Sequence, residues 1–210
     1  MSFQSIADYI NNHSEAIVNN LEPESIAVYK YLKSEFHRTN VAENLVFQFL
    51  YRSFYRLDNA GLSPHFKNEY FKILEEEKGR DAHDIATILR RLYGFKNRKD
   101  QNSLQFSFAT KLLNTIDNDL PIYDSEVARV FGYARPYQTN FEAKLAAYQN
   151  QLQHITDVYK TIVKEGLIEP ALTCFDLKFK EHGLPEMKRM DFLFWSAGKL
   201  MKRAPVSELV

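Results

Sequence analysis

Apolar residues recur at steps of three and four along nearly the whole chain. This spacing predicts amphipathic helices that each bury one face. No useful run of residues alternates with the period of a strand, and no internal repeat is visible. We therefore predict an all-α fold of about nine or ten helices. We expect a single helical domain over residues 1–210, divided into two lobes that meet near residues 105–131.

The most apolar of these segments is Val41–Leu57. Asn40 precedes it and has the side chain of a good helix N-cap, because its oxygen can accept a hydrogen bond from a free backbone N–H of the first turn. The pattern predicts one helix over the whole segment, with Val46, Phe47, Leu50 and Phe54 fully buried.

A long stripe of apolar residues follows position 138 and alternates steps of four and three. Such a pattern suits a core helix of a monomer or a helix that pairs with a second copy over residues 141–162. We favour the monomer, because sustained coiled coils usually run longer. The stripe consists of Phe141, Leu145, Tyr148, Leu152, Ile155, Tyr159 and Ile162.

Composition narrows the class of protein. A hydrophobic content of 45% and an aromatic content of 14% indicate a folded globule. The single cysteine, Cys174, excludes an internal disulfide and fits a reducing compartment, so we expect a cytoplasmic protein. No apolar run approaches the length of a membrane span, and no secretory signal is recognisable, so no membrane partner is expected. The histidines show no metal-ligand spacing, so neither a metal nor a cofactor is expected.

Basic residues are densest just before and within the polar segment Gly94–Asn102. The segment has no helical period, so we interpret it as an exposed loop. Its lysines and arginines either face solvent or contact phosphates. A formal net charge of zero counts against strong non-specific binding to nucleic acid, although a local basic face is enough for a specific contact. The candidate DNA-binding residues are Arg90, Arg91, Lys96, Arg98 and Lys99, with Arg129 and Arg135 further along the chain.

Two ionisable residues stand out at neighbouring helix ends. Lys111 lies about 60° outside the edge of an apolar stripe that begins at Phe108, at about 100° per residue. Pro121 breaks that helix, and Asp124 occupies the N-cap position of the next one. From the residues alone, we favour a lysine at the rim of a core helix and an ordinary capping aspartate.

The sequence FATK, followed by PIYDSEVARV, resembles the active-site stretch of the helix-hairpin-helix DNA glycosylases. The likeness is to the 8-oxoguanine glycosylases with a degenerate hairpin. Lys111 matches the lysine of that stretch, and Pro121, Asp124, Val127 and Arg129 match the segment that opens the following helix. The segment Asp191–Lys199, DFLFWSAGK, resembles the closing helix of bacterial proteins related to this group.

The resemblance implies a DNA glycosylase with lyase activity that excises an oxidised purine from duplex DNA. Lys111 would then form a Schiff base with the sugar of a flipped nucleotide, and Asp124 would assist it. An alternative is a non-catalytic helical module that keeps the framework and binds DNA or another protein. Two features favour this alternative: no L-P-G-V-G hairpin precedes Lys111, and the formal net charge is zero. The interval from lysine to aspartate (124 − 111 = 13) is also shorter than in the better-known members of the group.

Overall fold

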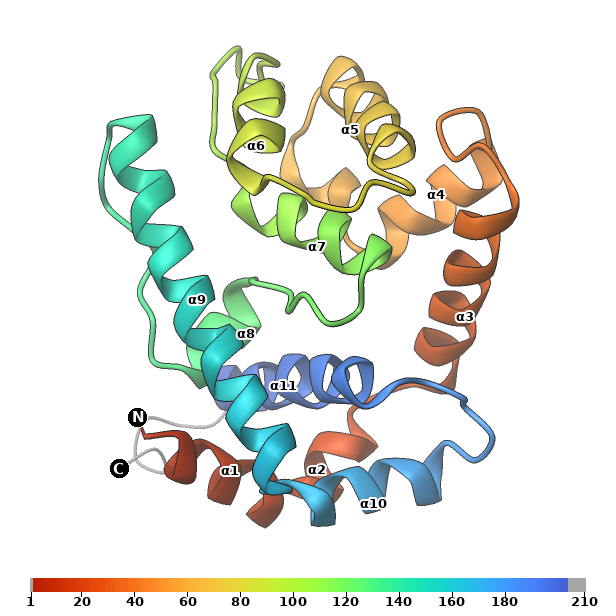
Figure 1. The fold of residues 1–210 in the computed structure, drawn as a ribbon, viewed down its shortest axis with the longest axis vertical. Helices are drawn as coiled ribbons and strands as arrows, with labels where there is room; N and C mark the ends of the chain where they lie inside the picture. Colours follow the sequence, from red (N-terminus) through yellow and green to blue (C-terminus); the bar gives the residue numbers. More distant parts are fainter. Residues whose placement is uncertain (1, 204–210) are drawn as a thin grey trace. The chain divides into compact units, whose positions relative to one another are not determined.

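The computed structural model describes residues 2–203, and within this range the chain is helical and has no named strand (Figure 1). Helices account for 68% of the residues, which confirms the predicted all-α class. The eleven α-helices found there compare with the nine or ten expected. They are α1 (Phe3–Asn12), α2 (Ser14–Asn19), α3 (Pro23–Arg38), α4 (Leu45–Phe54), α5 (Pro64–Glu76), α6 (Ile85–Tyr93), α7 (Phe106–Ile116), α8 (Ser125–Val130), α9 (Phe141–Glu165), α10 (Glu169–Lys178) and α11 (Glu186–Arg203), with a short 3-10 turn at Leu57–Ala60.

The chain divides into two compact units. Unit 1 combines the start of the chain, up to Pro23, with the part from Asn118 onward, and so contains α1, α2 and α8 to α11. Unit 2 is the continuous segment Glu24–Asp117 and contains α3 to α7. Lys111 therefore belongs to unit 2, and Asp124 belongs to unit 1.

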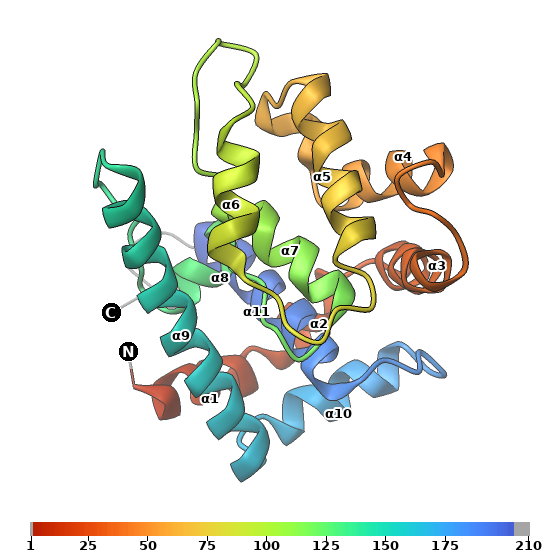
Figure 2. The same cartoon turned by 45° about the horizontal axis from the view of Figure 1, so that its top comes forward.

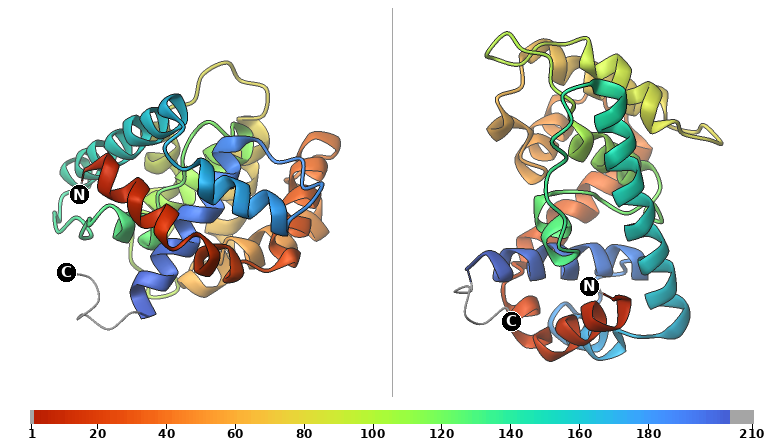
Figure 3. Two further views of the ribbon diagram at one scale, coloured as in Figure 1. Left: turned by 90° about the horizontal axis from the view of Figure 1, so that it is seen from below. Right: turned by 90° about the vertical axis from the view of Figure 1, so that its left-hand side faces the viewer.

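In unit 1, α11 is the element on which most other helices pack. It contacts α1, α2, α8, α9 and α10. Figure 3 shows α1 and α2, in red, beside α10 and α11, in blue. The ammonium of Lys178 on α10 closes the end of α2 by donating to the backbone oxygens of Val18, at 3.0 Å, and Leu21, at 2.8 Å. These bonds satisfy carbonyl groups that a helix end leaves without partners.

Three small residues of α11 allow its close packing: Ser196, Ala197 and Gly198, all buried. The Ser196 hydroxyl donates to the carbonyl oxygen of Ile17 at 2.7 Å and accepts a bond from the Asn20 amide at 2.9 Å. A Cβ added at Gly198 would lie 2.1 Å from the carbonyl oxygen of Glu126 on α8. The helix spacing therefore requires glycine at this position.

Ser196→Ala is expected to destabilise unit 1 by about 1–3 kcal/mol, because it leaves a buried carbonyl and a part-buried amide without their shared partner. Chemical denaturation followed by circular dichroism measures this change. Ser125→Ala is the matched control, since Ser125 is exposed on α8 and its loss should change stability by less than about 0.5 kcal/mol. Equal effects of the two substitutions would show that the Ser196 bonds contribute little.

In unit 2, α7 packs beside α6, as Figures 1 and 2 show. A chain of buried hydroxyls holds α7 in place. The Tyr51 hydroxyl bonds to those of Tyr70, at 2.9 Å, and Thr115, at 3.0 Å. The Tyr70 hydroxyl also donates to the carbonyl oxygen of Phe108 at 2.9 Å. Lys33 on α3 closes the end of α7 by donating to the backbone oxygen of Thr115 at 2.8 Å.

The predicted helix over Val41–Leu57 is wrong in its start and in its buried face. The helix begins at Leu45 and is capped by Asn44, whose side chain accepts from the N–H of Phe47 at 3.0 Å. Val46 is 59% exposed, Leu50 and Phe54 are partly exposed, and only Phe47 of the four predicted residues is buried.

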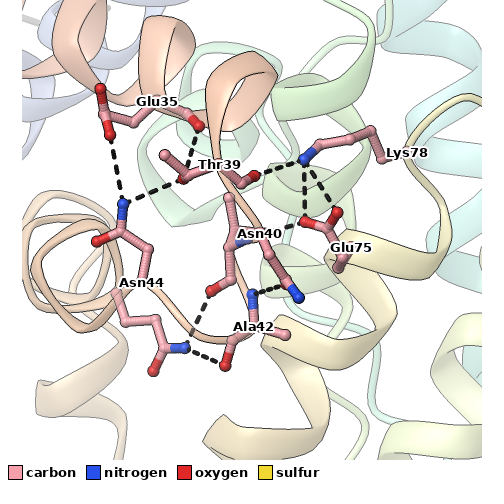
Figure 4. Close-up of polar contacts among 9 residues, drawn as sticks. Glu35, Thr39, Asn40, Ala42, Asn44, Glu75 and Lys78 are labelled. Carbon is pink, nitrogen blue, oxygen red and sulfur yellow. Dashed lines mark hydrogen bonds and ion pairs between the residues drawn. The ribbon is translucent and has the colours of Figure 1, made fainter.

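The reason is a polar turn before α4, shown in Figure 4. The Asn40 side chain accepts from the N–H of Ala42, at 3.0 Å, instead of capping a helix. Glu75 on α5 accepts from the N–H of Val41 at 2.8 Å, which holds the turn against α5. Gln48 then points inward and donates to the carbonyl oxygens of Val41 and Ala42 at 2.9 Å, so a polar residue occupies the buried face.

The other helix limits follow their sequence signals closely. Ser63 and Asp84 cap α5 and α6, and Asp124 caps α8, as predicted for Asp124. The long stripe forms α9, which ends at Gly166 with a φ of +63°. Most of the stripe is buried in the single chain, while Phe141 and Leu152 are partly exposed. The monomer stays the prediction, and a dimer through this helix stays its alternative. Within residues 2–203, no helix is long and apolar enough to cross a membrane.

Candidate functional site

Lys111 lies on α7 between the buried residues Thr110 and Leu112, and it is itself partly exposed. Its Nζ is 5.3 Å from the centre of the Phe108 ring, one turn earlier on the helix. A lysine at such a boundary keeps its stem on apolar surface while its amine reaches a polar edge. The position agrees with the rim placement that the helical spacing predicts. It also gives the amine an aromatic neighbour.

Asp124 is a buried cap, with only 8% of the residue exposed. Its Oδ1 accepts from the backbone N–H groups of Glu126, at 2.9 Å, and Val127, at 3.0 Å. One carboxylate oxygen thus meets both capping bonds. Asp84 caps α6 with both of its oxygens and is exposed. The two capping aspartates therefore differ in burial, although each accepts two backbone hydrogen bonds.

Asp124 shares the interior of unit 1 with the hydroxyl of Tyr159 on α9. This hydroxyl is buried and has no hydrogen-bond partner among the described residues. Burial, together with the nearby carboxylates of Asp191 and Asp124, raises the pKa of the Tyr159 hydroxyl well above its ordinary value. The Tyr159 ring packs on Phe194 with the ring centres 4.7 Å apart. This part of unit 1 therefore contains packed aromatic rings together with carboxylate groups.

Sequence reasoning missed a buried ion pair on α11. The Nζ of Lys188 lies 3.4 Å from Oδ2 of Asp191, and the two residues are 2% and 5% exposed. Their spacing of three residues, on the helix face that carries Phe192, was the available signal. Removing two charges from water is costly, so a buried pair is weak evidence of stability and marks a place to look for function.

The predicted basic cluster occurs in unit 2 but is partly neutralised. Arg91 forms ion pairs with Glu69 and Glu76 on α5, and Lys96 pairs with Asp100. The loop is ordered by Asn97, whose side chain accepts from the N–H groups of Lys99, at 2.8 Å, and Gln101, at 3.1 Å. The two neighbouring cations, Arg98 and Lys99, are exposed, and neither forms an ion pair with any described residue.

Arg90 is exposed on α6 in unit 2, whereas the other two candidate arginines belong to unit 1 and are not part of that cluster. Arg129 forms an ion pair with Glu126 and donates to the carbonyl oxygen of Gly198 at 2.9 Å. These contacts give Arg129 a structural role between α8 and α11, and its contact with DNA stays a prediction. Arg135 is exposed on the segment between α8 and α9. No group of three His, Cys, Asp or Glu side chains in residues 2–203 is placed to hold a metal ion.

If Arg98 and Lys99 contact DNA phosphates, the double substitution Arg98→Ala with Lys99→Ala is expected to weaken DNA binding on every sequence alike. It should lower the slope of log K against log salt by about 1.8 for duplex DNA, because each phosphate contact contributes about 0.9. Fluorescence anisotropy at several salt concentrations measures the slope. Arg91→Ala is the control, since its partners are carboxylates within the chain. A slope that changes only with Arg91→Ala would remove Arg98 and Lys99 from the DNA contact.

Comparison with known proteins does not assign a family, since no family model, curated protein or solved structure matches the chain.

Proposed function

We propose that this protein is a DNA glycosylase with lyase activity that excises an oxidised purine of the 8-oxoguanine type. Lys111 is the proposed nucleophile and Asp124 the proposed assisting carboxylate. The proposal rests on the resemblance of residues 108–111 and 121–130 to the glycosylase active-site stretch. The burial of Asp124 adds support from the fold.

The proposed reaction needs a nucleophilic amine and a carboxylate, which Lys111 and Asp124 would provide. The target nucleotide must leave the base stack, because its sugar carbon C1′ is out of reach inside a duplex. The neutral amine of Lys111 then attacks C1′, and the electron pair of the C1′–N9 bond leaves with the base, which takes up a proton. Opening of the sugar ring gives a Schiff base between Lys111 and C1′. The carboxylate of Asp124 stabilises the positive charge that develops on the sugar.

The structural observation that supports the proposal is the contrast between two capping aspartates. Asp84 and Asp124 each accept two backbone bonds at a helix start, yet Asp84 is exposed and Asp124 is buried. Capping alone does not require burial, so the site of Asp124 serves a further purpose in this proposal.

Borohydride trapping tests the proposal, because reduction converts a Schiff base into a stable protein–DNA adduct. The wild-type protein is incubated with duplex DNA that carries 8-oxoguanine, and with abasic duplex DNA. A shifted band on a denaturing gel is expected with both. If neither DNA gives an adduct while the protein binds both, the lysine mechanism is wrong.

A second candidate function is a non-catalytic module that binds another protein. The observation in its favour is an apolar face on α4 in unit 2, where Leu45, Val46 and Phe49 are 74%, 59% and 61% exposed. Neighbouring exposed apolar residues often mark contact surfaces. Failure of the wild-type protein to bind DNA even at low salt would favour this protein-binding module over the enzyme.

A further inference from the structure

The segment between α8 and α9, residues 132–140, lacks helical structure but is fixed along α9 (Figure 1). The Tyr133 hydroxyl bonds to Nδ1 of His154. The Gln151 amide donates to the carbonyl oxygen of Ala134 at 3.3 Å. Asn140 closes the segment by capping α9, where its side chain accepts from the N–H of Ala143 at 3.1 Å. Both ends of the segment are therefore attached to the same helix.

Tyr137 projects from this fixed segment into solvent. Its exposed fraction of 89% is the largest among the exposed large apolar residues of the described chain. Pro136, directly before it, is buried. The backbone is thus held by an inward-facing ring, while the next ring points outward. A fixed backbone lowers the entropic cost of binding a ligand to that outer ring.

The charges around Tyr137 favour an anionic partner. From Val127 to Phe141 the chain contains no aspartate or glutamate, and its two charged residues are Arg129 and Arg135. Arg129 is engaged with Glu126 and Gly198. Arg135 is exposed and forms no ion pair with another described residue, so its guanidinium is available to an external phosphate.

We propose that Tyr137 and Arg135 form a contact site for single-stranded nucleic acid. In this site an unpaired base stacks on the Tyr137 ring, and Arg135 contacts a neighbouring phosphate. An exposed ring combined with a nearby cation is the arrangement by which proteins hold single strands. A duplex interior offers no free base face, because its bases stack on one another. The proposal shares the DNA partner of the proposed function but requires no catalysis by Lys111.

Binding of an undamaged oligothymidylate, followed by fluorescence anisotropy, tests the site in the full chain. Tyr137→Ala is expected to weaken binding about 5- to 150-fold, which corresponds to the loss of one stacked base. Tyr137→Phe keeps the ring and should bind as the wild type does. Arg135→Ala should lower the salt slope by about 0.7, the value for one contact on a single strand. Tyr31→Ala is the matched control, since Tyr31 on α3 is also exposed, at 39%.

Stacking of a base on Tyr137 can be detected by fluorescence, separately from the affinity. An oligonucleotide with a fluorescent purine analogue, 2-aminopurine, should change its emission on binding to the wild type and to Tyr137→Phe, but not to Tyr137→Ala. Wild-type affinity retained by Tyr137→Ala, an equal loss with Tyr31→Ala, or no binding by the wild type would each overturn the proposal. The glycosylase proposal fails on a different result, the absence of a borohydride adduct, so the two failures are distinguishable.

Discussion

Replacing Lys111 with glutamine is expected to abolish the borohydride-trapped adduct with 8-oxoguanine DNA. Glutamine keeps most of the side-chain length but has no amine that can form a Schiff base. Because Lys111 lies partly exposed at the rim of α7, its loss should remove little packing, and the circular dichroism spectrum should stay unchanged. DNA affinity, measured by anisotropy, should also persist.

The matched control for this substitution is Lys199→Gln. Lys199 is also partly exposed, and its Nζ lies 4.3 Å from the centre of the Trp195 ring, as Lys111 lies against Phe108. The control therefore removes an ammonium from a similar position on a different helix, and the adduct should still form. Trapping that survives in Lys111→Gln, or that is lost equally in both variants, contradicts the assignment of Lys111.

A substitution can also separate the role of Asp124 as a helix cap from its proposed role in catalysis. Asp124→Asn keeps the cap, since asparagine caps helices about as well as aspartate, but it removes the negative charge. We expect a large fall in the rate of adduct formation with little change in stability. Asp84→Asn provides the comparison, because it makes the same change in an exposed cap. Equal rates for the two variants would leave Asp124 as a structural residue only.

Gly198→Ala is expected to have the largest effect on stability. The new Cβ would lie 2.1 Å from the Glu126 carbonyl oxygen and 2.8 Å from its Cα, and neither backbone atom can move aside cheaply. The helices α8 and α11 would have to separate, which also strains the bond from Arg129 to the Gly198 carbonyl oxygen. Overpacking costs about 1–3 kcal/mol or more. We expect the upper end of this range, with a fall in Tm of about 6–12 °C by calorimetry.

A glycine elsewhere in the chain shows whether the effect is specific. A Cβ added at Gly94 would lie 3.3 Å from the Arg91 carbonyl oxygen, a contact that a small shift relieves, and the φ there is −64°. Gly94→Ala should therefore change Tm by only a degree or two. If Gly198→Ala melts within a degree of the wild type, α8 and α11 do not pack as closely as described.

Much of this fold follows from short-range sequence signals. Ser63, Asp84 and Asp124 precede their helices by one residue, and Gly166 ends α9 in the left-handed conformation. These signals are local because a cap satisfies N–H or C=O groups of its own helix. The predicted start of α4 was wrong because the true start depends on a contact between residues far apart in the sequence. Its position depends on Glu75, which lies 34 residues from Val41, and no local pattern reports such a contact.

In the candidate site, too, some features follow from local sequence signals and others depend on packing. The cap role of Asp124 and the rim position of Lys111 could be inferred from spacing alone. The burial of Asp124 and the ion pair of Lys188 with Asp191 could not, nor could the lack of a partner for the Tyr159 hydroxyl among residues 2–203. Each of these depends on the packing of α8, α9 and α11, which the helical period of a single segment does not determine.

Unit 1 consists of segments that come before and after unit 2 in the sequence, and this order affects folding during synthesis. The ribosome completes all of unit 2 at Asp117, whereas α1 and α2 must wait for α11. From Asp117 to the end of α11, 86 residues remain (203 − 117 = 86). At translation rates of about 5–20 residues per second, the part of the wait that follows completion of unit 2 lasts about 4–17 s. For that time Ile6, Ile10 and Ile17, all buried in the finished protein, lack the helices that later cover them. Exposed apolar surface of this kind makes a nascent chain prone to aggregation until the covering helices are made.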